Sequence, residues 1–80
     1  MAKIDRQMVR LYKIKDDDKT REYSVVTGEA IGVASVEKAT LEYRYSGDDI
    51  GTFTYFIKDL MIRSVKMGKV LPDRIVHGFG

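Results

Sequence analysis

Two stretches near the start of the chain alternate apolar and polar side chains with a period of two, which is typical of β-strands. The first covers residues 7–15 and carries apolar side chains on both faces. The second covers residues 20–27 and places Tyr23 and Val25 on the same face. The acidic run 16–18 separates them, and aspartate favours turns because its side chain bonds to nearby backbone amides. This pattern predicts a β-hairpin.

The next apolar stretch, residues 30–36, contains three β-branched residues and Gly32. Both residue types disfavour a helix, since β-branched side chains lose freedom there and glycine lowers helix stability. We therefore expect a third strand. Residues 40–46 alternate again and predict a fourth strand. The alternative is a short helix over residues 29–38, which would change the order of elements to ββαβα.

From residue 49 onward the hydrophobic period becomes that of an amphipathic helix. Asp48 or Asp49 is placed to cap its start, and Gly68 fits the position just after its end. We predict a helix over residues 49–67. The side chains expected to face the sheet are Ile50, Phe53, Ile57, Leu60, Met61, Ser64 and Val65.

The predicted fold is α+β: a four-stranded antiparallel β-meander followed by one long helix packed on one face (ββββα), with a short extended tail over residues 70–80. The alternative for this tail is an added strand, in the same sheet or in that of a neighbour. The chain has 80 residues, the length of one small domain, so we expect residues 1–80 to form a single domain. The order of elements resembles that of small single-stranded-DNA-binding coactivator-type domains that dimerise. This resemblance covers topology alone and transfers no site residue.

The composition indicates a folded chain, with 44% apolar and 32% charged residues. Cysteine is absent, so no disulfide or thiolate site stabilises the small core. Oligomerisation is the other common stabiliser, and we expect a homodimer or a higher homo-oligomer. The lack of cysteine also fits a reducing compartment, which predicts a cytoplasmic protein. No stretch is long and apolar enough to span a bilayer, so we expect no membrane partner.

Charge is unevenly distributed along the chain although the net charge is only +2. Residues 1–15 hold five basic side chains and one acid, residues 16–59 five basic side chains and ten acids, and residues 60–80 four basic side chains and one acid. The two ends are therefore basic and the middle acidic. If the ends meet in the fold, as termini often do, they would form one basic face.

The sequence carries none of the residue patterns that enzymes, metal sites or nucleotide sites need. His77 is the single histidine, so a nucleophile would have just one candidate base, near the C-terminus. The acidic runs 16–18 and 48–49 lack the alternating ligand spacing of a calcium loop. Gly28 and Gly32 are not followed by the lysine and hydroxyl of a phosphate loop. We expect no catalysis, no cofactor and no metal.

The positive signal is the mixture of basic and aromatic side chains on the predicted strands. On a sheet face that the helix leaves open, such residues can stack on bases and neutralise phosphates. This favours a binding module for DNA or RNA. The predicted nucleic-acid-binding residues are Arg10, Tyr12, Lys13, Arg21, Tyr43 and Arg44.

A second hypothesis is a protein-interaction or assembly module, such as a small regulator, an inhibitor or a structural subunit of phage or archaeal type. Tyr55 and Ile62 are seven residues apart on the predicted outward face of the helix, set among charged residues. An apolar pair at such a place favours contact with a second copy or with a protein partner.

Overall fold

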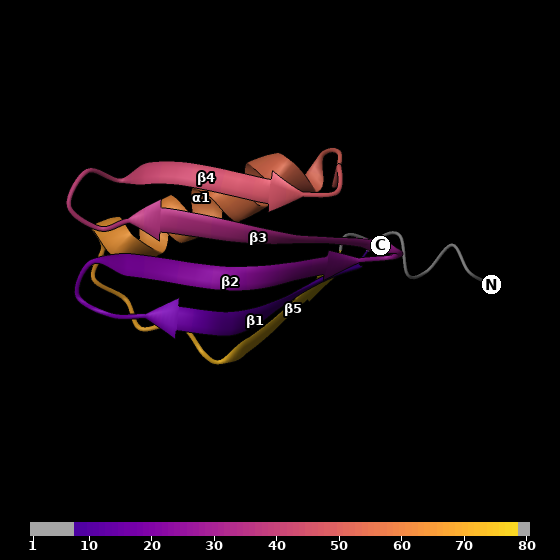
Figure 1. The fold of residues 1–80 in the computed structure, drawn as a ribbon. Coiled ribbons are helices and arrows are strands. Elements are labelled where there is room, and N and C mark those ends of the chain that lie inside the picture. The colour runs from indigo at the N-terminus through magenta and orange to yellow at the C-terminus, as the bar shows by residue number, and fades with distance from the viewer. Residues whose placement is uncertain (1–7, 79–80) are drawn as a thin grey trace.

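The computed structural model describes residues 8–78, in which five antiparallel strands form one sheet and a single helix packs on one of its faces (Figure 1). The strand order across the sheet is β4-β3-β2-β1-β5. The elements are β1 (Met8–Asp16), β2 (Thr20–Thr27), β3 (Ala30–Glu37), β4 (Glu42–Gly47), α1 (Phe53–Lys66) and β5 (Arg74–Gly78).

The predicted α+β class and the antiparallel order of the first four strands are confirmed, and the alternative with a helix over 29–38 is wrong. The difference lies in the segment expected to be a tail. Residues 74–78 form β5, which pairs antiparallel with β1. Ile75 and His77 share the side of the sheet that carries Leu11 and Val9, so the strand adds two half-buried side chains to that side.

The helix begins later than predicted because the two aspartates expected to cap it have other partners. Its first residue is Phe53, and Thr52 at the cap position makes no side-chain bond to the helix. Asp48 accepts a hydrogen bond from the backbone of Ile31 at 3.0 Å, and Asp49 accepts one from Gly51 at 2.8 Å. These aspartates therefore fix the connection between β4 and α1.

The end of the helix matches the prediction. Gly68 follows the last turn with φ of 66°, a conformation that glycine adopts without strain. Its N–H donates to the carbonyl of Val65 at 3.1 Å, and the N–H of Lys69 donates to the carbonyl of Ser64 at 2.9 Å. This pair of bonds is the Schellman motif, which reverses the chain direction after the helix.

The core lies between α1 and the face of the sheet that we call the covered face. Gly32 is needed there because the ring of Tyr45 occupies the space where a side chain would project. At the β5 edge, the rings of Phe56 and His77 stack with centroids 4.3 Å apart. The fully buried core side chains are Val9, Leu11, Tyr23, Val25, Ala34, Val36, Ile57 and Met61.

The segment between α1 and β5 is tied to the first hairpin. The Tyr23 hydroxyl donates a hydrogen bond to the carbonyl of Pro72 at 2.6 Å, and burial raises the pKa of this phenol. The side chain of Lys13 forms an ion pair with Asp73 at 3.2 Å. These contacts hold β5 at the edge of the sheet beside β1.

Candidate binding surface on the open sheet face

The face of the sheet turned away from α1 is covered by no element within residues 8–78, and we call it the open face (Figure 1). Strand register sets which side chains meet on it. Arg10 pairs with Val26 of β2 on one side and with Val76 of β5 on the other. Val26 in turn pairs with Ile31 of β3. Directly paired residues project from the same face, so these four side chains form one row across four strands.

The next row begins with Arg74 of β5 opposite Tyr12 of β1, and continues through Ser24 and Val33. Several apolar side chains of the two rows are open to solvent: Tyr12 is 39% exposed, Ile31 59% and Val76 44%. We call the main side chains of these rows the Arg10–Arg74 patch. It consists of Arg10, Tyr12, Val26, Ile31, Arg74 and Val76.

Within residues 8–78, the two arginines of the patch have no carboxylate partner. Neither forms an ion pair with any residue between positions 8 and 78. The two rows themselves contain no aspartate or glutamate. The patch therefore combines exposed apolar surface with two positive charges that no carboxylate of residues 8–78 neutralises.

The opposite half of the open face is acidic. Glu22, Glu37 and Glu42 lie there, and Glu37 and Glu42 line a small polar hollow of about 150 Å³. Arg44 donates to one carboxylate oxygen of Glu42 through Nε and Nη2, at 3.2 and 3.0 Å. This positive charge is thus already paired. We call this region the acidic half: Thr20, Glu22, Ser35, Glu37, Glu42 and Arg44.

Three of the six residues predicted to bind nucleic acid lie on the covered face instead of the open face. Lys13, Arg21 and Tyr43 point to the side of α1, whereas Arg10, Tyr12 and Arg44 lie on the open face. The reason is the alternation of side chains along a strand: neighbours such as Tyr43 and Arg44 must project from opposite faces. Arg21 has the same parity as buried Tyr23, so it projects into the interior.

Arg21 is only 4% exposed, and its charge is used inside the protein. It pairs with Asp16 at 3.2 Å and donates through Nη1 to the hydroxyl of Ser64 on α1 at 2.8 Å. Asp16 also pairs with Lys38 at 2.7 Å. Burial opposes ionisation of Asp16, but the hydrogen bonds from Lys38 and Arg21 outweigh it and lower the pKa of this carboxyl. This cluster joins the first hairpin to the helix.

The other two displaced residues also serve the covered side. The hydrogen bond with Asp73 raises the pKa of Lys13 against the opposing effect of desolvation, so the ion pair favours the charged amine. The Tyr43 hydroxyl is buried and has no hydrogen-bond partner within residues 8–78; burial raises its pKa. Neither side chain is available on the open face.

The pair predicted on the outward side of the helix is only partly exposed. Tyr55 is 77% exposed, but Ile62 is half-buried and packs against the core. Tyr55 is therefore the more exposed member of this pair, and the contact predicted for the two residues stays a prediction. Met61, the neighbour of Ile62 along the chain, is fully buried, and the side chain of Ile62 lies at the margin of the same packed layer.

Arg74 and Val76 were absent from the predicted site because the tail over residues 70–80, even as an added strand, was assigned no particular strand partner. The alternation of Arg74, Ile75, Val76 and His77 is a strand signal, but short apolar alternation near a terminus does not reveal which strand it will join. Pairing with β1 is what brings Arg74 beside Tyr12. Ile31 was correctly predicted to lie in a strand. Its exposure could not be predicted, because it depends on which face of the sheet α1 covers.

No family model, no curated protein and no solved structure matches this chain. Within residues 8–78, no helix is long and apolar enough to cross a membrane. Across the same described part of the chain, no three histidine, aspartate or glutamate side chains gather as a metal site would need.

Proposed function

We propose that this chain is a non-catalytic interaction module that binds a partner protein through the Arg10–Arg74 patch. The observation that carries the proposal is the composition of two neighbouring rows on the open face: aliphatic side chains, one tyrosine and two arginines that pair with no carboxylate of residues 8–78. Tyrosine and arginine are enriched in protein interfaces, and contiguous exposed apolar surface marks contact sites.

Charge complementarity defines the partner. A surface that places aspartate or glutamate beside apolar side chains would neutralise Arg10 and Arg74 and cover Ile31 and Val76. A second copy of this chain fits less well. A two-fold face-to-face contact would bring the same patch from both copies together and oppose arginine to arginine, with no carboxylate from either row.

A protein partner accounts for more of the patch than a nucleic acid does. Single-stranded nucleic acid is held by several aromatic rings along a positive groove, and the patch offers one ring, Tyr12. Exposed Ile31 and Val76 provide no contact suited to a phosphate, and the acidic half lies on the same face. DNA or RNA binding through Arg10, Tyr12 and Arg44 stays the second hypothesis, and the experiment below separates the two.

Two further parts of the proposal rest on the sequence. Cytoplasmic location rests on the absence of cysteine. Self-association into a homodimer or higher homo-oligomer rests on the small core of an 80-residue chain. Static light scattering on the purified protein measures the second directly, and it does so independently of the patch.

A photoreactive phenylalanine analogue at Ile31 tests the proposal, because this side chain is exposed and lies at the end of the Arg10 row. We expect light to join the module to one protein, which is then identified and purified for titration. Arg10→Glu and Arg74→Glu should each weaken its binding about tenfold or more. The matched control is Arg44→Glu, the same charge change on the same face, and it should leave the affinity within about threefold.

Three outcomes contradict a protein partner at this patch. Cross-linking to nucleic acid, with binding that weakens steeply as salt rises, would support the second hypothesis instead. Cross-linking to a second copy would make the patch a self-association surface. Equal losses in Arg10→Glu and Arg44→Glu would show that total charge, and not the patch, determines binding.

A further inference from the structure

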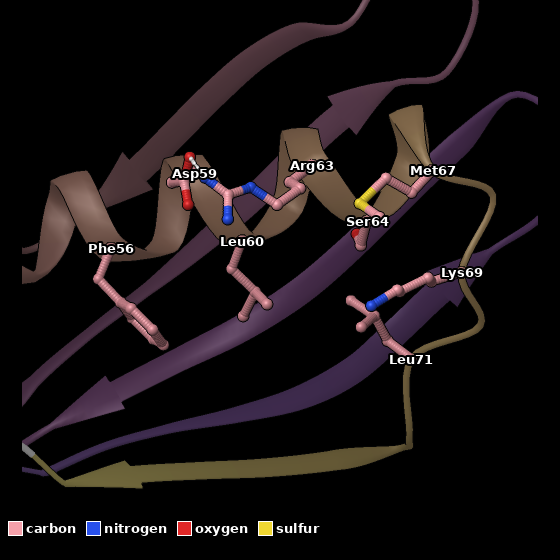
Figure 2. A pocket seen from close by; sticks show the side chains of 8 residues that line it. All are labelled: Phe56, Asp59, Leu60, Arg63, Ser64, Met67, Lys69 and Leu71. Carbon is pink, nitrogen blue, oxygen red and sulfur yellow. Dashed lines mark hydrogen bonds and ion pairs between the residues drawn. The ribbon is translucent and has the colours of Figure 1, made fainter.

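A separate surface lies on the other side of the sheet, between α1 and the segment that follows it. This groove encloses about 330 Å³. Figure 2 shows Phe56 and Leu60 pointing from α1 toward the sheet, with Leu71 across from them. Met67 lies at the helix end of the groove, where it is 59% exposed. We call this space the helix groove; its lining is mainly apolar.

The position of α1 explains why the groove exists. The helix packs against β3 and β4, which form one side of the sheet, whereas β5 is at the opposite edge (Figure 1). The chain must cross back from the helix to that edge, and the Schellman motif at Gly68 starts this return. The groove is the space left between the helix and the returning segment.

Lys69 is held at the groove by the backbone of the same motif. Its N–H donates to the carbonyl of Ser64 at 2.9 Å. In Figure 2 its side chain extends from the returning segment toward α1, above Leu71. Lys69 forms no ion pair with any residue from 8 to 78. One positive charge, which no carboxylate of the described residues neutralises, therefore lies over an apolar space.

The other charged side chains around the helix groove, Asp59 and Arg63, leave its rim with a net positive charge. Arg63 pairs with Asp59 at 3.2 Å, and both side chains are largely exposed, at 68% and 61%. Exposed helical pairs of this kind are weak and rearrange readily. With one carboxylate against Arg63 and Lys69, the rim carries a net charge of +1.

We propose that the helix groove binds a single-chain aliphatic carboxylate, with its chain against Phe56, Leu60 and Leu71 and its carboxylate at Lys69. The volume favours such a ligand because it is at the low end of the range for small-molecule sites. A neutral chain would leave Lys69 without a partner, and a cationic head group would be repelled by it. The proposal uses no residue of the Arg10–Arg74 patch and stands apart from the proposed function.

Three ligands with the same ten-carbon chain test the choice of head group: decanoate, decanol and decyltrimethylammonium. Titration calorimetry measures affinity, and ¹H–¹⁵N NMR shifts locate the site, with all ligands kept below micelle formation. We expect decanoate to bind most tightly and to shift the amides of Leu60, Met67 and Lys69. Shortening the chain to octanoate should weaken binding about tenfold, since each methylene contributes roughly threefold to fourfold.

Two lysine substitutions with the same charge change test the position of the head group. Lys69→Glu should weaken decanoate binding about fivefold or more. Lys58→Glu is the matched control, because Lys58 is an exposed residue of α1 that does not line the groove; its affinity should stay within about twofold. Met67→Glu, at an exposed position after the helix, should abolish binding while leaving the protein folded.

The proposal is overturned by any of three results. Decanoate that produces neither heat nor shifts would show that the groove holds no such ligand. Equal affinity for decanoate and decyltrimethylammonium would show binding to apolar surface without selection by Lys69. Equal losses in Lys69→Glu and Lys58→Glu would place the charge effect outside the groove.

Discussion

Arg21 and Arg10 lie in paired strands of the same sheet, but they project from opposite faces. Arg21 on the covered face is 4% exposed and contacts Asp16 and Ser64. Arg10 on the open face is half-buried among apolar side chains and has no ion-pair partner within residues 8–78. Arg21 is bound to groups inside the fold, whereas the charge of Arg10 is paired with no side chain of residues 8–78.

The comparison shows that residue type and strand assignment do not identify a binding residue. Both arginines belong to strands that were predicted correctly, and both lie near tyrosines. What separates them is which face α1 covers and whether a carboxylate is within reach. The expected effects of substitution should therefore differ in kind: loss of stability on the covered face, and loss of binding on the open face.

The largest expected difference comes from replacing each arginine by methionine. Arg21→Met removes the donor to Ser64 and one partner of Asp16, and breaking a buried ion pair costs about 3 kcal/mol of unfolding free energy. Arg10→Met removes no side-chain hydrogen bond or ion pair within the described part of the chain, so its unfolding free energy should change by less than about 0.5 kcal/mol. Urea denaturation at neutral pH measures both.

A double variant checks the reason for the loss. Arg21→Met combined with Asp16→Asn also removes the carboxylate, which in Arg21→Met keeps only Lys38 of its two basic partners, so it should recover part of the stability lost in Arg21→Met. Equal effects of Arg21→Met and Arg10→Met would contradict the distinction between the two faces.

The two faces should also differ, by a smaller amount, in how well they tolerate a larger side chain. Gly32→Ala on the covered face adds a methyl group where the ring of Tyr45 lies, and should lower the unfolding free energy by about 2 kcal/mol. Ser46→Val enlarges an exposed residue of neighbouring β4 on the open face. It should change the unfolding free energy by less than about 0.5 kcal/mol. Thermal unfolding followed by circular dichroism measures both.

A companion substitution tells steric conflict apart from a general weakness of β3. Gly32→Ala in a Tyr45→Ala background should be nearly neutral, because the ring that meets the added methyl group is gone. An unchanged loss in that background would mean that the Tyr45 ring is not what excludes a side chain at position 32.

Local pattern was enough to predict most of the elements. The period of two predicted the first, second and fourth strands, and the β-branched residues with Gly32 predicted the third, all with ends within two residues of those observed. The acidic turn formed as expected: Asp17 accepts hydrogen bonds from Lys19 and Thr20 at 2.9 and 2.8 Å. Gly68 ended the helix because a single residue with positive φ is a local requirement.

The features that were predicted wrongly depend on contacts between segments that are distant in the sequence. Asp48 bonds to Ile31 on β3 instead of capping the helix, and nothing near Asp48 in the sequence reveals that acceptor role. The register shift between Lys13 and Lys15 also changes which side chains share a face, and a bulge of this kind has no clear local signal. The Arg10–Arg74 patch itself exists only because β5 joins β1.

One part of the site prediction was avoidable from the sequence. Tyr43 and Arg44 are neighbours in one strand, as are Tyr12 and Lys13, so a regular strand cannot place both members of either pair on one face. Applying that alternation would have kept Arg10 and Tyr12 on one face and would have left only one of Tyr43 and Arg44 on it. The exposed aliphatic residues beside them would still have required the strand order.

The smallest expected contrast is in the pH dependence of stability. Asp16 has a folded-state pKa below its ordinary value of 3.8, since the hydrogen bonds from Lys38 and Arg21 outweigh the opposing effect of burial. On acidification the unfolded chain therefore takes up this proton first. The stabilisation from Asp16 is complete above about pH 5 and is lost as the pH falls through the folded-state pKa.

Urea denaturation at a series of pH values from about 7 to about 2 measures this effect. Asp16→Asn should be less stable than the wild type at neutral pH and should lose less on acidification, so that the two curves converge at low pH. Arg10→Met should follow the wild-type curve, because Arg10 has no carboxylate partner within residues 8–78. A constant difference between wild type and Asp16→Asn would show that the Asp16 charge adds nothing to stability, leaving the covered-face arginine to be held by Ser64 and packing alone.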